Sequence, residues 1–78
     1  MVTFKVSLNT MDMAKDFANT ASKYDFDIDL SSDRYVVNAK SIMGIFSLDL
    51  SKAIKVDAHV DEAQAGELKA DMAKFIVD

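Results

Sequence analysis

The stretch Asp25–Ala39, DFDIDLSSDRYVVNA, contains two runs in which apolar and polar residues alternate, one on each side of a polar turn. The apolar positions are Phe26, Ile28 and Leu30 before the turn, and Tyr35, Val37 and Ala39 after it. A period of two is typical of a strand with one buried face, and Ser-Ser-Asp is typical of a turn. The stretch therefore predicts a hairpin of two antiparallel strands.

Two further segments alternate in the same way, one at the start of the chain and one before the closing stretch of residues 61–78. Their apolar positions are Val2, Phe4, Val6 and Leu8 in the first, and Ile54, Val56, Ala58 and Val60 in the second. Each segment predicts one more half-buried strand, so we expect four strands in all.

Helical spacing of apolar residues appears between these strands and after them. The expected inward positions are Ala14, Phe17, Ala18 and Ala21 in a first helix, and Ala65, Leu68, Met72, Phe75 and Ile76 in a closing helix. Asn9, Thr10 and Asp12 offer cap side chains for the first helix, which we expect to end near Tyr24. The closing helix is expected to run to the end of the chain.

The predicted order is β-α-β-β-α-β-α, which includes a short helix after Ser41. One apolar face on every strand favours an α+β open-faced β-sandwich with a four-stranded, largely antiparallel sheet and three helices on one face. A chain of 78 residues, half of them hydrophobic, has material for one core. We therefore expect a single domain over residues 1–78.

Charge and composition exclude several classes of function. The chain has no cysteine, a net charge of −4 and no basic cluster, which argues against thiolate metal sites and nucleic-acid binding. No apolar run is long enough to span a bilayer and no signal-peptide pattern is visible, so we expect a cytoplasmic protein without membrane insertion.

The residues that could carry chemistry elsewhere are better explained as solvated side chains. His59, the only histidine, shares the parity of Lys55 and Asp57, which places it on the watery face of its strand. The alternating aspartates 25, 27 and 29 lack the glycine and the closing glutamate of an EF-hand loop. No metal site, cofactor site or catalytic acid-base pair can be assembled from this sequence, so we expect no enzyme.

The segment Ala39–Leu48, AKSIMGIFSL, interrupts the alternation and contains more large apolar residues than a short surface helix requires. Ser41 is expected to cap this helix, and Ile45 and Leu48 can face the sheet. Its remaining apolar residues, Ile42, Met43 and Phe46, lie on another side and are expected to form an exposed contact patch.

The runs TASKYD (20–25) and VNAKSIMGIFSLDL (37–50) resemble HPr, the phosphocarrier of the bacterial sugar phosphotransferase system (PTS), and its regulatory relative Crh. The resemblance covers essentially the whole chain and implies the same open-faced sandwich. It also implies that Ser41 corresponds to the regulatory phosphoserine of the family. The partner surface that it implies consists of Met13, Lys40, Ile42, Met43 and Phe46.

The phosphohistidine motif of the family, of the type G-[IL]-H-[AT]-R-P, is missing at the start of the first helix. Ungapped counting from TASKYD puts Thr10 at the histidine, Asp12 at the arginine and Met13 at the proline. A phosphothreonine is a stable ester that cannot pass its phosphoryl group onward, and Asp12 with Asp16 would oppose an incoming phosphate. We therefore predict that the chain is not a histidine phosphocarrier.

The resulting hypothesis is a non-enzymatic, Crh-like regulatory protein that is phosphorylated on Ser41. The partners that the resemblance implies are an HPr kinase/phosphorylase, a catabolite-control transcription factor and sugar-transport components of the PTS. Three alternatives remain open. The first is a docking or competing subunit that is never phosphorylated, the second is an interaction domain of an unrelated system, and the third is an enzyme, against which stands the lack of any nucleophile-base pair or metal cluster. We expect a monomer.

Overall fold

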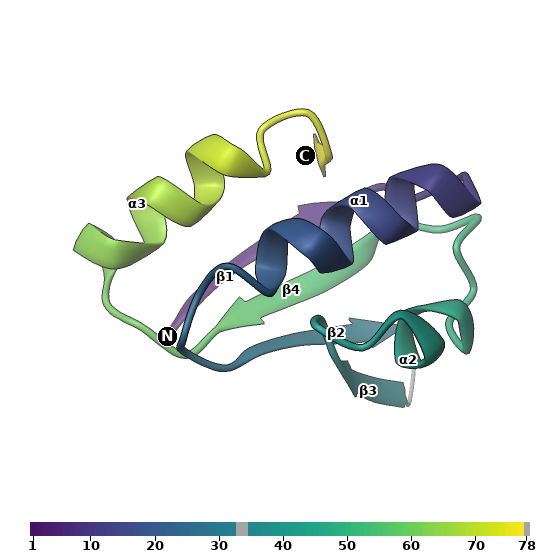
Figure 1. Ribbon diagram of the computed structural model, residues 1–78, viewed down its shortest axis with the longest axis horizontal. Coiled ribbons are helices and arrows are strands. Elements are labelled where there is room, and N and C mark those ends of the chain that lie inside the picture. The colour runs from purple at the N-terminus through teal and green to yellow at the C-terminus, as the bar shows by residue number, and fades with distance from the viewer. Residues whose placement is uncertain (33–34, 78) are drawn as a thin grey trace.

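The computed structural model describes residues 1–32 and 35–77 and shows a single antiparallel sheet with three helices against it (Figure 1). The strands are β1 (Val2–Val6), β2 (Ile28–Ser32), β3 (Tyr35–Asn38), β4 (Ile54–Ala58) and β5 (Ile76–Val77). The helices are α1 (Met11–Ala21), α2 (Ile42–Phe46) and α3 (Glu62–Asp71). The α+β class, the antiparallel sheet and the three helices predicted from the sequence are confirmed.

The strand order is β3-β2-β4-β1-β5, with every neighbouring pair antiparallel. One row across the sheet pairs Phe4 with Val56, Val56 with Leu30 and Leu30 with Val37, and these side chains face the helices. The next row contains Lys5 opposite Lys55, both exposed on the other face. This register explains the alternation, because neighbouring residues of a strand point to opposite faces.

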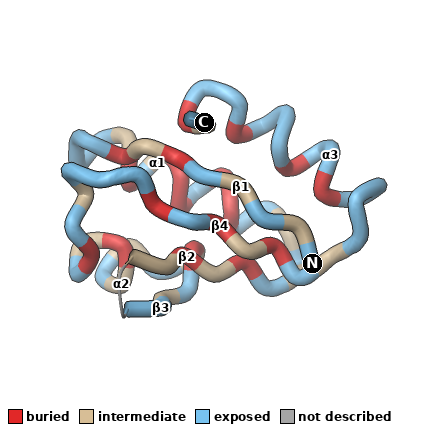
Figure 2. The backbone as a smooth tube through the Cα atoms, turned by 180° about the vertical axis from the view of Figure 1, so that it is seen from behind, coloured by how far each residue is buried: buried red, intermediate tan, exposed pale blue. Residues whose placement is uncertain are grey.

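Buried side chains from the sheet and the helices form one core, while the outer sides of the helices are exposed (Figure 2). Phe17 on α1 and Phe75, which follows α3, pack edge to face with ring centroids 5.5 Å apart. Ile45 and Leu48, expected in the core, are 0% and 6% exposed. The aromatic pair thus holds the C-terminal segment, residues 72–77, against α1.

The C-terminal segment differs from the expectation, because the sheet has five strands and not four. The closing helix ends at Asp71, and Ile76, expected on that helix, lies in β5 opposite Val6. The outer edge of β1 would otherwise leave N–H and C=O groups unpaired, and pairing with β5 satisfies some of them. A strand of two residues is too short to show alternation, whereas Phe75 and Ile76 happen to continue the helical spacing.

The first helix is also shorter than expected. It ends at Ala21, and the chain continues through a turn in which the Tyr24 N–H donates to the Ala21 carbonyl (3.2 Å). The Tyr24 hydroxyl then donates to Asp71 at the end of α3. This contact and burial of the side chain raise the pKa of Tyr24 to about 12, with burial as the larger cause.

Candidate functional site

Thr10 caps the N-terminus of α1, and it is the residue that the resemblance places at the phosphohistidine position. Thr10 has extended backbone angles (φ −131°, ψ 158°), and its Oγ1 accepts a hydrogen bond from the Met13 N–H (3.1 Å). Asp12 follows in the first turn, where a negative charge interacts favourably with the helix dipole. Both features stabilise a helix end, and neither supplies an imidazole or a positive charge.

Ser41 occupies the corresponding position at the start of α2. Its Oγ accepts a hydrogen bond from the Gly44 N–H at 3.2 Å, and the residue is exposed. Asn38 organises the turn before it, because its carbonyl accepts from the Ser41 N–H (3.0 Å) and its Oδ1 from the Lys40 N–H (2.9 Å). Ser41 is therefore a helix cap, as expected, and its hydroxyl oxygen lies at the surface.

The apolar side chains of α2 divide between core and surface, although less sharply than expected. Met43 is 80% exposed and Ile45 is fully buried. Ile42 and Phe46, expected to be exposed, are half-buried and pack against the core. Around the helix axis, Ile42 and Phe46 lie between the buried Ile45 and the exposed Met43, so these two side chains lie at the boundary with the core. The exposed part of the predicted patch is centred on Met43.

Gly44 allows α2 to approach the sheet closely. A methyl group added to Gly44 would lie 3.2 Å from the Cβ of Val37 on β3, closer than ordinary carbon contacts of about 3.5–4.0 Å. The same methyl group would lie 3.4 Å from the Ser41 Oγ. The glycine thus determines how near the Ser41 end of α2 lies to the hairpin.

Besides Ser47 at the end of α2, the loop after this helix contains another exposed serine, Ser51. Its N–H and O–H both donate to Asp49 Oδ1, at 3.1 and 2.5 Å. These two hydrogen bonds hold the pKa of the Asp49 carboxyl below its ordinary value. The Ser51 hydroxyl is therefore bonded to a carboxylate, whereas the Ser41 hydroxyl is bonded to a backbone N–H.

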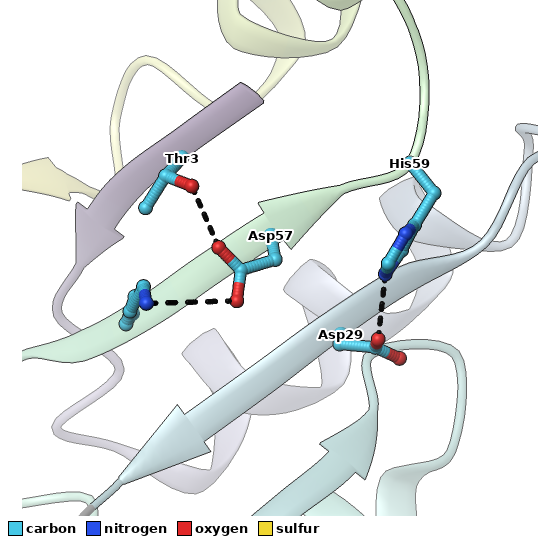
Figure 3. Close-up of polar contacts among 5 residues, drawn as sticks. Thr3, Asp29, Asp57 and His59 are labelled. Atoms are coloured by element: carbon cyan, nitrogen blue, oxygen red, sulfur yellow. Dashed lines mark hydrogen bonds and ion pairs between the residues drawn. The ribbon is translucent and has the colours of Figure 1, made fainter. Parts of the chain in front are cut away.

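His59 lies on the open face of the sheet, as predicted (Figure 3). Its Nε2 is 2.8 Å from Asp29 Oδ2, and the two side chains are 45% and 37% exposed. Beside them, Thr3 donates to Asp57 at 2.7 Å. Within residues 1–32 and 35–77, no three His, Asp or Glu side chains come together as a metal site would require.

A shallow pocket lies between α1 and the segment that follows α3. It has a volume of about 300 Å³ and is lined by Asp12, Met13, Asp16, Lys74 and Phe75. The Lys74 ammonium forms an ion pair with Asp16. The other four lining residues were named from the sequence, but Lys74 was missed, since a pairing across 58 positions has no local signal.

The described part of the chain contains no helix with the length and apolar character needed to cross a membrane.

Comparison with known proteins gives consistent matches. The family profile described as "PTS HPr component phosphorylation site" matches residues 10–78. HPr-C-His from Thermoanaerobacter tengcongensis is 33% identical, with a TM-score of 0.75, over 95% of this chain and 92% of that one. A phosphocarrier protein HPr from Bacillus anthracis is 29% identical, with a TM-score of 0.70, over 95% of both chains. Crh from Bacillus subtilis, described as a swapped dimer, is 28% identical, with a TM-score of 0.64, over 100% of this chain and 93% of that one.

Proposed function

The chain belongs to the HPr family of the phosphotransferase system, and we propose that it is a regulatory member phosphorylated on Ser41 and not a histidine phosphocarrier. In this proposal it acts in the cytoplasm, where a kinase that uses ATP modifies it. The observation that carries the proposal is the exposed Ser41 hydroxyl at the start of α2, with the exposed Met43 two residues away.

The start of α1 supports the part of the proposal that concerns the carrier reaction. A phosphocarrier needs a nucleophile whose phosphorylated form is labile, and an imidazole meets this requirement. Thr10 instead uses its side-chain oxygen as a cap, and Asp12 places a negative charge where phosphate would approach. The only imidazole, His59, is hydrogen-bonded to Asp29 on the open face of the sheet.

The surroundings of Ser41 support the part that concerns regulation. Phosphorylation of Ser41 would add a charge of about −1.5 to −2 at the edge of the surface centred on Met43. A partner that binds this apolar surface would then meet an anion, so the modification can change which partner binds. The proposed partner surface also includes Met13, Lys40 and the half-buried Ile42 and Phe46, and the proposed partners are a kinase, a catabolite-control transcription factor or transport components.

Incubation with ATP and an HPr-type kinase, followed by phosphopeptide mapping, tests this proposal. We expect one phosphate on Ser41 and none in the Ser41→Ala variant. Ser47→Ala is the matched control, because Ser47 is an exposed serine at the other end of α2, where its hydroxyl donates to the Gly44 carbonyl (2.6 Å). Labelling that survives Ser41→Ala, or that maps to Ser51, contradicts the assignment.

A docking subunit that is never phosphorylated is the second candidate, and the exposure of Met43 favours it equally. A binding assay with purified transport components separates the two. The docking hypothesis predicts that binding falls in Met43→Ser and that ATP with the kinase does not change it. The regulatory hypothesis predicts that prior treatment with ATP and the kinase changes binding of the wild type but not of Ser41→Ala.

A further inference from the structure

We propose that the pocket between α1 and the C-terminal segment binds an arginine side chain of a partner protein. Asp12, Met13 and Asp16 line it from α1, and Lys74 with Phe75 from the chain after α3. Met13 also belongs to the partner surface proposed above, but the two carboxylates, Lys74 and Phe75 do not. The inference therefore goes beyond the proposed function and does not depend on phosphorylation.

The charges of the pocket favour a cation. Asp12 and Asp16 are four residues apart on α1, so their carboxylates project from the same side of the helix and repel each other. Lys74 forms an ion pair with Asp16, but no basic group of residues 1–32 and 35–77 lies within 4.0 Å of Asp12. The pocket thus contains two carboxylates and one ammonium, a net charge of −1 that one incoming cation would neutralise.

The aromatic wall of the pocket already contacts a cation. The Lys74 Nζ lies over the Phe75 ring, 5.2 Å from its centroid, and Phe75 is held in place against Phe17. The Lys74 side chain is 62% exposed, so it can move into solvent at little cost. Lys74 therefore occupies a position that a cation from outside could take.

The two carboxylates of the pocket favour arginine among the cationic side chains. A guanidinium is planar and has five donors, so it can bind two carboxylates at once, whereas an ammonium is a compact charge without this fork. Phe75 is 2% exposed, so its ring contributes a small apolar contact and not an open face for stacking. Met13 is half-buried and offers an apolar surface for the methylene groups of the side chain. In the proposed complex the guanidinium bridges Asp12 and Asp16, and Lys74 turns outward.

Titration of the ¹⁵N-labelled protein with acetyl-Gly-Arg-Gly-amide at low ionic strength tests the proposal by NMR. We expect saturable shifts at the amides of Asp12, Asp16 and Phe75, with a Kd on the order of millimolar. The peptide with citrulline in place of arginine keeps the shape and loses the charge, and should produce no such shifts. Equal shifts with citrulline, or no shifts with arginine up to about 50 mM, would overturn the proposal.

Three variants distinguish this site from general attraction to an acidic protein. Asp12→Asn should weaken binding roughly two- to fivefold, while Asp25→Asn, which removes one exposed charge elsewhere, should leave it nearly unchanged. Lys74→Gln should tighten binding by a similar factor, because it removes the competing cation. Equal weakening by both aspartate variants, or loss of binding in Lys74→Gln, refutes the assignment. Preferential binding of acetyl-Gly-Glu-Gly-amide at these amides would show an anion site and refute it as well.

Discussion

Replacement of the two glycines of the chain by alanine should stabilise the fold at one position and not at the other. Both glycines lie inside helices, Gly44 in α2 and Gly66 in α3. Alanine is favoured over glycine inside a helix by about 0.8–1.0 kcal/mol. Around Gly66 nothing lies within 4 Å of an added Cβ, so Gly66→Ala should raise the free energy of unfolding by about 0.5–1 kcal/mol.

At Gly44 the added methyl group would lie 3.2 Å from the Val37 Cβ, so α2 or β3 must move by a few tenths of an ångström. Overpacking of this kind costs typically about 1–3 kcal/mol, which cancels or exceeds the gain in helix propensity. We therefore expect Gly44→Ala to be neutral or to destabilise by up to about 2 kcal/mol. Since the propensity gain is common to both variants, their difference isolates the steric cost.

Urea unfolding of the wild type and the two variants, followed by circular dichroism, gives the three free energies. The m-values should agree, because neither change alters the surface exposed on unfolding by much. Equal stabilisation by Gly44→Ala and Gly66→Ala would refute the reasoning. It would mean that α2 moves freely relative to the hairpin and that Gly44 is not needed for its position.

Three further outcomes are expected. Met43→Ser should change stability by less than about 0.5 kcal/mol, whereas Leu48→Ala should cost roughly 2–5 kcal/mol in a denaturant titration, and similar losses would place Met43 in the core. Because the pKa of Tyr24 is raised from 10.0 to about 12, folding favours its neutral form, so its contribution is complete below pH 10 and is lost as pH rises from 10 to 12. Tyr24→Phe should flatten the pH dependence of the unfolding midpoint in that range, and an unchanged slope would contradict the shift. Phosphoenolpyruvate with the first enzyme of the phosphotransferase system should leave no acid-labile phosphate, and a label on His59 would contradict this.

Local patterns were sufficient for most of the fold. Alternation placed Leu30 and Val56 on the buried face and Lys55 on the open one, because side chains of a strand alternate whatever the strand pairs with. Three-residue spacing also placed Ile45 and Leu48 in the core. Leu48 follows the end of α2, in a turn where its N–H donates to the Ile45 carbonyl (3.1 Å), so the helical spacing continues for one turn beyond the helix. Ser41 was recognisable as a cap, and Thr10 was one of three candidates with Asn9 and Asp12, since a cap depends on the helix that directly follows it.

Burial at the edges of the fold could not be predicted in the same way. Ile42 and Phe46 have the spacing of exposed residues, but they are half-buried because α2 lies against the margin of the core. Ile76 has the spacing of a helical residue, but it forms a strand because β1 offers an open edge beside it. In each case a neighbour far away in the chain overrides the local pattern.

Periodicity and capping are properties of contiguous residues, and they determined the first seven elements in the order β-α-β-β-α-β-α, most of the core-facing positions and the starts of the first two helices. Contacts between distant residues were decided only by tertiary packing. The pairing of Lys74 with Asp16 spans 58 positions and depends on the edge-to-face contact of Phe75 with Phe17, which brings the C-terminal segment onto α1. The pocket with its two carboxylates and the fifth strand therefore form only because residues 72–77 pack against α1 and pair with β1. Local sequence carries no signal for contacts between residues so far apart in the chain.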